Sequence, residues 1–219
     1  MLMTKQKGMS LIELLVSMAL GLLLLGAASS MALSSLFANR DGLRNMALEQ
    51  EIQPIMSLMV RELRRSGYSQ FATDDTTTPA KYFRKINMPG AAVTTVSGKK
   101  IYTGECIIFR YERPGSINNT LTSNEVSGFM LNNGQVLMLN SPTNLSINTC
   151  DASDSAWVPM NSIERINVTE LKFIATTETV AGADLINQLN ISITGSAKGA
   201  EFSSTLSESI QLRNLPRVY

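Results

Sequence analysis

The N-terminal part of the chain carries its strongest hydrophobic signal. No charged residue occurs between Leu14 and Asn39, a run of 26 residues. As a helix this run would be about 39 Å long at ~1.5 Å per residue, which exceeds the ~30 Å hydrocarbon core of a bilayer. Lys5 and Lys7 precede the run, and Arg40 follows it. The positive-inside tendency therefore predicts a cytoplasmic N-terminus, with the rest of the chain on the outer side of the membrane.

Beyond Arg40 the hydrophobic pattern becomes one-sided. Apolar residues recur at helical intervals with charges between them, so we expect the helix to continue with one apolar face: Leu43, Met46, Ala47, Ile52, Ile55, Met56, Met59 and Leu63. Pro54 removes a backbone donor, and we expect it to interrupt or bend this helix. Gly67 can adopt the left-handed cap conformation, so the predicted helix covers about residues 9 to 66.

Residues 68–219 show turn signals and the alternation of β-strands, except for the loop-rich segment 71–100. Asn132-Asn133-Gly134 predicts a tight hairpin, because Asn-Gly tolerates the positive φ angles of such a turn. The strands are expected to form an antiparallel sheet packed by one face on the second half of the helix, which gives an α+β fold. Six strands are predicted, at residues 105–111, 128–131, 135–139, 167–175, 189–194 and 202–212.

Composition removes several classes of chemistry. The 19 Lys and Arg residues nearly balance the 18 Asp and Glu residues, so the overall charge does not favour nucleic acid or an anionic membrane surface. There is no histidine, which excludes the commonest general base, Ser/His and Cys/His nucleophile pairs, and most catalytic zinc sites. No glycine-rich nucleotide loop and no G-x-S-x-G motif occurs. We therefore expect no enzyme activity, no cofactor and no metal.

Glu13 lies inside the hydrophobic segment, where an ionised carboxylate costs roughly 2.5 to 3.5 kcal/mol and usually marks function. It needs a cationic partner. Cleavage after Gly8 would place Glu13 fifth in the new chain and would create an α-amino group at Met9. The two groups do not pair easily within one continuous helix, but the amine of a neighbouring subunit, displaced along the axis, can neutralise the carboxylate.

The stretch KQKGMSLIELLVSMALGLLLLGAA resembles the class III leader and N-terminal helix of type IV prepilins and type II secretion pseudopilins. The resemblance implies a pilin-like fold, removal of residues 1–8 by a prepilin peptidase, methylation of Met9 and polymerisation through the hydrophobic helix. Met9 departs from the phenylalanine usual at that position. The alternatives are a secretory signal cut after Ala28 and an ordinary uncleaved anchor. Glu13, five residues after Gly8, argues against both.

Two further features narrow the resemblance. The run IMSLMVRELRRSGY, the Asn-Gly hairpin and a last strand ending in Ile210-Gln211-Leu212-Arg213-Asn214 look like the minor pilin PilW family. This implies a structural subunit that helps to start or cap a type IV pilus, in cells that use such pili for twitching motility or natural transformation. The alternative is a minor pseudopilin of the J family in type II secretion. A membrane-anchored enzyme or binding domain is a third hypothesis.

The pilin resemblance also implies a domain order and a location. Residues 1–8 form the leader, 9–39 the helix of the membrane or fibre core, 40–67 its amphipathic continuation and 68–219 a globular, β-rich periplasmic region. The chain would span the inner membrane once before assembly and lie in the fibre or at its tip, at the cell surface, afterwards. Its expected partners are other minor and major pilins, the prepilin peptidase and the inner-membrane assembly platform.

Cys106 and Cys150 are the only cysteines. They are too few for a zinc site and too far apart for a C-x-x-C redox motif. They fit either one structural disulfide or two unrelated buried thiols. Export favours the disulfide, because the periplasm is oxidising, and we expect the polar segment 140–161 to return Cys150 towards Cys106.

Arg61, Arg64 and Arg65 share one helix face at spacings i, i+3 and i+4. They are a candidate contact for acidic residues of an adjacent pilin. The alternatives are DNA and a solvated helix end, where cations complement the helix dipole. Only Tyr68 and Phe71 are available nearby for base stacking, so we do not expect a nucleic-acid partner.

Overall fold

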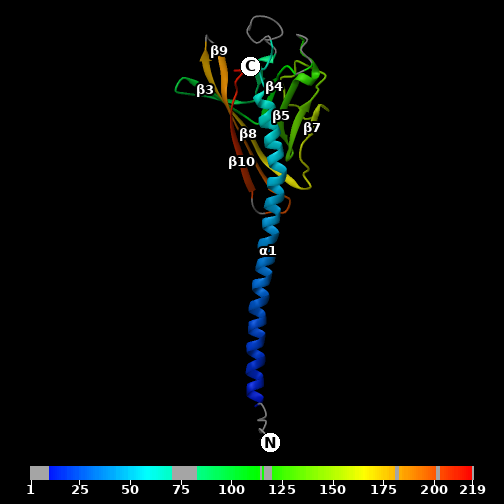
Figure 1. Ribbon diagram of the computed structural model, residues 1–219, viewed down its shortest axis with the longest axis vertical. Helices are drawn as coiled ribbons and strands as arrows, with labels where there is room; N and C mark the ends of the chain where they lie inside the picture. Colours follow the sequence, from blue (N-terminus) through cyan, green and yellow to red (C-terminus); the bar gives the residue numbers. More distant parts are fainter. Residues whose placement is uncertain are drawn as a thin grey trace. The chain divides into compact units, whose positions relative to one another are not determined.

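The chain divides into two compact units, Met1–Arg44 and Asn45–Tyr219. One α-helix, α1 (Leu11–Arg64), contributes to both (Figure 1). We call the second unit the head. The computed structural model describes residues 10–70, 83–113, 115, 120–180, 183–200 and 203–218.

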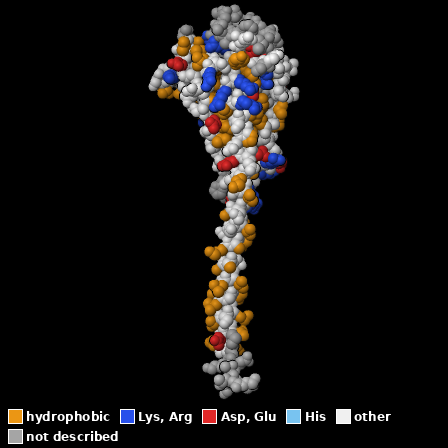
Figure 2. Space-filling view, viewed as in Figure 1, with side chains coloured by type: hydrophobic (Ala, Val, Ile, Leu, Met, Phe, Trp, Pro, Cys, Tyr) orange, Lys and Arg blue, Asp and Glu red, His pale blue; other side chains and the backbone are white. Residues whose placement is uncertain are grey.

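In the first unit, every large apolar side chain of α1 is exposed, and Figure 2 shows hydrophobic side chains at the surface along this segment. Leu24 is 72% exposed and Met31 is 78% exposed. This helix is long enough and apolar enough to cross a membrane. Exposed apolar surface of this extent is unfavourable in water, so this segment requires lipid or other helices around it.

In the head, the same helix buries one face. Its buried apolar residues are spaced three or four positions apart, as a helix packed on a sheet requires: Leu48, Ile52, Ile55, Met56, Met59 and Leu63. The expected interruption at Pro54 is wrong, because α1 continues through this residue to Arg64. Pro54 itself is exposed, and its buried neighbours Ile52 and Ile55 hold the helix on the sheet. Packing thus offsets the roughly 3 kcal/mol that an interior proline costs.

The end of α1 is fixed by the chain that follows it. Gly67 has a φ of +78°, and its N–H donates to Arg110 O at 2.9 Å. A Cβ atom at this position would lie 3.2 Å from Cβ of Pro216, so the site favours glycine for conformation and for space. The C-terminal segment therefore lies beside the end of α1, as Figure 1 also shows.

The described strands of the head belong to one eleven-stranded sheet. Its order is β2-β3-β8-β9-β11-β1-β4-β5-β6-β7, and β10 also pairs with β9. A short 3-10 helix, Ser123–Glu125, precedes β5. The strands are β1 (Lys85–Asn87), β2 (Ala92–Val96), β3 (Lys99–Gly104), β4 (Cys106–Arg110), β5 (Val126–Asn132), β6 (Gln135–Asn140), β7 (Trp157–Pro159), β8 (Ile166–Val180), β9 (Ala183–Ala197), β10 (Ser203–Gln211) and β11 (Arg217–Val218).

The predicted α+β class is confirmed, with one long N-terminal helix followed by a mostly antiparallel sheet. The sheet is not wholly antiparallel, because β1 and β11 pair in parallel. The predicted hairpin is present between β5 and β6, where Asn133 and Gly134 both have positive φ angles. A Cβ at Gly134 would lie 2.1 Å from Oδ1 of Asn167, so a larger residue would have to displace that side chain, and the φ of +79° also favours glycine.

Two segments expected to be loops contain strands. Residues 83–100 of the loop-rich segment hold β1, β2 and the start of β3, whereas residues 71–82 lie outside the described residues. All five residues of β2 are exposed, so this strand lacks the alternation by which strands are recognised. The expected loop 140–161 contains β7, of which only Trp157 is buried.

Strand β4 is buried on both faces and lies between two layers. Ile107 and Phe109 face the main core with α1. Cys106 and Ile108 belong to a smaller cluster with Ile147 and Trp157, under the segment that follows β6. A strand covered on both sides reads as a continuous apolar run, as Cys106-Ile107-Ile108-Phe109 does. The residues after β4 are therefore held from both sides, and they form the site described next.

Candidate functional site

Glu13 lies in the first turn of α1. Its backbone N donates to Ser10 O at 3.0 Å, and its carbonyl accepts from Ser17 Oγ at 2.6 Å. The carboxylate forms no ion pair with any residue that the structure describes. Gly8 and Met9, the predicted cleavage and methylation residues, lie outside the described residues.

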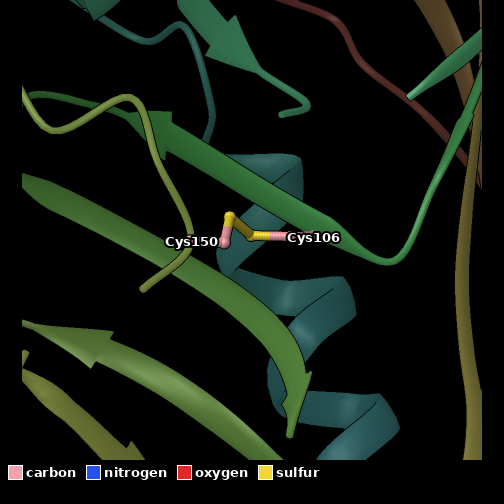
Figure 3. Close-up of a disulfide and its surroundings, with 2 residues drawn as sticks. All are labelled: Cys106 and Cys150. Carbon is pink, nitrogen blue, oxygen red and sulfur yellow. A yellow bond between two sulfur atoms is a disulfide. The ribbon is translucent and has the colours of Figure 1, made fainter. Parts of the chain in front are cut away.

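Cys106 and Cys150 form a disulfide that ties the segment after β6 to β4 (Figure 3). Their Cα atoms are 6.5 Å apart, and 44 residues separate them in sequence. Closing a loop of this length stabilises the folded state by about 4 kcal/mol in the chain-entropy model.

Arg110 also binds the segment after β6. Its guanidinium donates to Leu145 O at 3.2 Å, to Ile147 O at 3.0 Å and to Asn87 Oδ1 at 3.0 Å. Arg110 is 3% exposed, and this burial lowers its pKa. A buried guanidinium must find acceptors, and here backbone and amide oxygens supply them, so Arg110 and the disulfide together fix the loop.

The three arginines that were predicted to share a helix face differ in their interaction partners. Nε of Arg61 lies 3.5 Å from Oε1 of Glu62, and Nη1 of Arg65 lies 3.6 Å from the same oxygen. Arg64 is exposed, and its guanidinium makes no ion pair or hydrogen bond with any described residue. Arg61 and Arg65 therefore already have an acidic partner within the head, whereas Arg64 has none.

Glu62 links the end of α1 to the sheet. It is 5% exposed, and its carboxylate accepts a short hydrogen bond from the Tyr111 hydroxyl. Burial and the Glu62 carboxylate raise the pKa of Tyr111. The centroid of the Tyr111 ring lies 6.0 Å from the guanidinium carbon of Arg65 and 5.2 Å from that of Arg113. Such contacts add cation–π attraction to the ion pair.

A pocket of about 290 Å³ adjoins this cluster. Glu112 is 1% exposed, and its Oε2 accepts from Gln70 N at 2.7 Å and from Ser69 Oγ at 3.3 Å. The residues that line the pocket come from α1, the loop after it, the residues after β4 and the C-terminal segment: Arg64, Arg65, Tyr68, Tyr111, Glu112 and Asn214.

The sequence analysis did not identify Glu62, Tyr111 or Glu112. One signal was available for Glu62, because it lies three residues after Met59 and next to Leu63 on the apolar face of the predicted helix. A carboxylate on that face needs a buried partner. For Tyr111 and Glu112 the sequence offers no comparable signal, since their role depends on which element reaches the end of β4.

No group of three or more His, Cys, Asp or Glu side chains capable of holding a metal occurs among the residues that the structure describes. The carboxylates near the end of α1 are Glu62, which lies beside Arg61 and Arg65, and Glu112, which accepts from Ser69 and Gln70. This arrangement suits an ion-pair network or a polar ligand, and the absence of a cofactor stays a prediction.

Comparison with known proteins gives two family matches. The profile of the family described as "Prepilin peptidase-dependent protein B" matches residues 41–212. The profile described as "Prokaryotic N-terminal methylation motif" matches residues 3–29. No curated protein matches the chain in sequence.

A search of solved structures finds similarity to a type IV-like pilin from Thermus thermophilus, at 13% identity and a TM-score of 0.40. The match covers 78% of this chain and 98% of that one. This likeness is too distant to add to the architecture described above.

Proposed function

Because the chain belongs to the family of prepilin peptidase-dependent protein B, within the type IV pilin superfamily, we propose that it is a minor pilin of PilW type that helps to start or cap a type IV pilus. It would act as a structural subunit and not as an enzyme. One observation carries the proposal. A methylation motif at residues 3–29 leads into a helix whose large apolar side chains are exposed from Leu11 to Met46 and which buries one apolar face from Leu48 to Leu63.

The expected maturation follows from the leader motif. A prepilin peptidase would cut between Gly8 and Met9, and the new amine of Met9 would be methylated. Residues 9–39 would then form the core helix, 40–67 its continuation and 68–219 the globular region. Before assembly the chain would cross the inner membrane once with the globular region in the periplasm, where an oxidising environment would favour the Cys106–Cys150 disulfide.

Assembly would bury the first half of α1 among the helices of other minor and major pilins. The amine of a neighbouring Met9 would pair with the Glu13 carboxylate, which has no partner among the described residues. Glu13→Ala should weaken subunit pairing and lower pilus number, while Glu49→Ala, at an exposed acid in the head segment of α1, should not. Normal pilus numbers with Glu13→Ala would mean that this charge pairing is wrong.

The pilus role is tested by deleting the gene and by searching purified fibres for the protein. The proposal predicts few or no surface pili, loss of twitching or natural transformation where the cell has them, and the protein in sheared fibres. The competing role is that of a J-like minor pseudopilin. In that case deletion would block export of folded proteins and leave pili unchanged.

A further inference from the structure

The pocket beside the end of α1 contains a buried acceptor that lacks a donor. Oε2 of Glu112 accepts from Gln70 and Ser69, whereas Oε1 has no hydrogen-bond partner among the described residues, although the residue is 1% exposed. Leaving a buried polar atom unsatisfied costs on the order of 1 to 3 kcal/mol, and more for a charged group. Oε1 has almost no solvent-accessible surface, so a ligand that brings an N–H or O–H group to it must displace part of the pocket wall, and the new hydrogen bond would then remove this cost.

Whereas Glu112 favours a hydrogen-bond donor, Arg64 favours a negatively charged group in the same pocket. Its exposed guanidinium lines the pocket and has no acceptor among the described residues, whereas Arg65 beside it pairs with Glu62. A guanidinium binds a carboxylate with two parallel hydrogen bonds. Figure 2 shows several Lys and Arg side chains gathered on one face of the head, and such a field attracts acidic groups.

Tyr68 adds an aromatic ring on a backbone that two hydrogen bonds hold in place. The Tyr68 side chain is 45% exposed. Its N–H donates to Arg65 O at 3.0 Å, and its carbonyl accepts from Glu112 N at 2.9 Å. A ring on a fixed backbone loses little entropy when a partner binds, and tyrosine and arginine are the residues that most often dominate protein interfaces.

We propose that this pocket binds an acidic peptide segment of a neighbouring pilus subunit. An Asp or Glu carboxylate of that segment pairs with Arg64, its chain crosses the Tyr68 ring, and one of its N–H groups donates to Oε1 of Glu112. The pocket is open to solvent, whereas sites for small molecules enclose most of the ligand, so a chain segment fits it better than a free amino acid. The inference rests on the proposed function, which supplies the neighbouring subunits.

The test places a photo-crosslinker, p-benzoylphenylalanine, at position 68 of the full chain in cells that assemble pili. After irradiation, fibres are purified and the crosslinked peptide is identified by mass spectrometry. We expect adducts with another subunit, at a peptide that carries Asp or Glu within a few residues of the crosslink. Replacing that acid with Lys should restore the adduct in an Arg64→Glu background.

The matched variants separate recognition from folding. Arg64→Glu changes an exposed side chain and should lower adduct yield about tenfold, equivalent to ~1.4 kcal/mol. Glu112→Gln should lower it severalfold, with Trp157 fluorescence and the disulfide confirming that the head is folded. Lys99→Glu, which reverses the same charge on the β2–β3 hairpin outside the pocket, should leave the yield unchanged.

Three results would overturn the inference: adducts at segments without an acid, an unchanged yield with Arg64→Glu, or protein in fibres without any adduct from position 68. In the last case the proposed function would stand. Absence of the protein from fibres would remove the proposed function and this inference together.

Discussion

The two halves of α1 belong to one continuous helix but solve opposite problems. In the first half, apolar residues occur on all sides and stay exposed, so no part of the described protein covers them. In the second half, apolar residues recur at helical spacing and are buried against the sheet from Leu48 to Leu63. The predicted face began too early, because Leu43, Met46 and Ala47 are exposed. Helix propensity and length do not distinguish the halves. The halves differ in the surroundings that their side chains suit: lipid or a fibre core for the first half, and a protein core for the second.

Removing the disulfide should have the largest effect on the head while leaving the first half of α1 unaffected. Changing Cys106 and Cys150 to Ala should lower the free energy of unfolding of the head by about 4 kcal/mol, because the unfolded chain loses a 44-residue constraint. Membrane integration of the first half should not change. Urea denaturation of the full chain in mild detergent checks this, since Trp157 is the only tryptophan and reports on the head. A stability within 1 kcal/mol of the wild type would contradict the structural role of the bridge.

A matched pair of methionines tests the halves directly. Met59 is 0% exposed and Met31 is 78% exposed. Met59→Ala should destabilise the head by about 3 kcal/mol through lost burial and a cavity, and Met31→Ala should stay within ~0.5 kcal/mol by the same urea assay. Equal effects of the two changes on stability would contradict the claim that only the second half of α1 packs in the protein core.

A charge in the first half of α1 should affect membrane insertion and leave the stability of the head unchanged. Leu24→Arg places a charge in the middle of the first half and should oppose membrane insertion by about 3 kcal/mol. The fraction of protein that resists extraction from membranes at high pH measures this effect. The stability of the head should be unchanged, and undiminished insertion of the variant would show that this segment does not depend on lipid.

The smallest expected effect concerns the polar link at the end of the buried half. Tyr111→Phe removes the hydroxyl donor to Glu62 and should cost about 2 kcal/mol, because the acceptor is a buried carboxylate. Its pH dependence has a definite sign. The folded-state pKa of Tyr111 is raised above its ordinary value near 10, so its contribution is complete below that pH and is lost as pH rises through the folded-state pKa.

The measurement compares urea midpoints of the wild type and Tyr111→Phe between pH 8 and pH 11. The difference between the two proteins should shrink at the alkaline end of this range. A difference that stays constant across the range would show that ionisation of the Tyr111 hydroxyl does not affect the stability of the head.

Much of the fold follows from local patterns in the sequence. Helical spacing from Ile52 to Leu63 predicted the buried face of α1, and Asn133-Gly134 predicted the β5–β6 hairpin, because both signals depend on neighbouring residues alone. Pro54 does not interrupt the helix, because the packing that overrides a proline comes from the sheet; the alternative expectation, a bend at Pro54, stays a prediction. The exposed strand β2 and the short strand β1 have no one-sided pattern, and their pairing is decided by distant partners.

The candidate site was predictable only in part. The shared helix face of Arg61, Arg64 and Arg65 stays a prediction. Their different contacts depend on Glu62, whose carboxylate lies beside Arg61 and Arg65 and accepts a hydrogen bond from Tyr111. The pocket joins residues from positions 64 to 214. Such a site requires the tertiary arrangement, since no local spacing relates its members.

The most direct test of the account is the intact and N-terminal peptide mass of non-reduced protein from native membranes, with and without the prepilin peptidase. We expect a chain that begins at Met9, is heavier by one methyl group and has Cys106 linked to Cys150. Without the peptidase the chain should still begin at Met1. A mature chain that begins at Ser29, or one that keeps Met1 with the peptidase present, would contradict the pilin account and favour a secreted or permanently anchored domain.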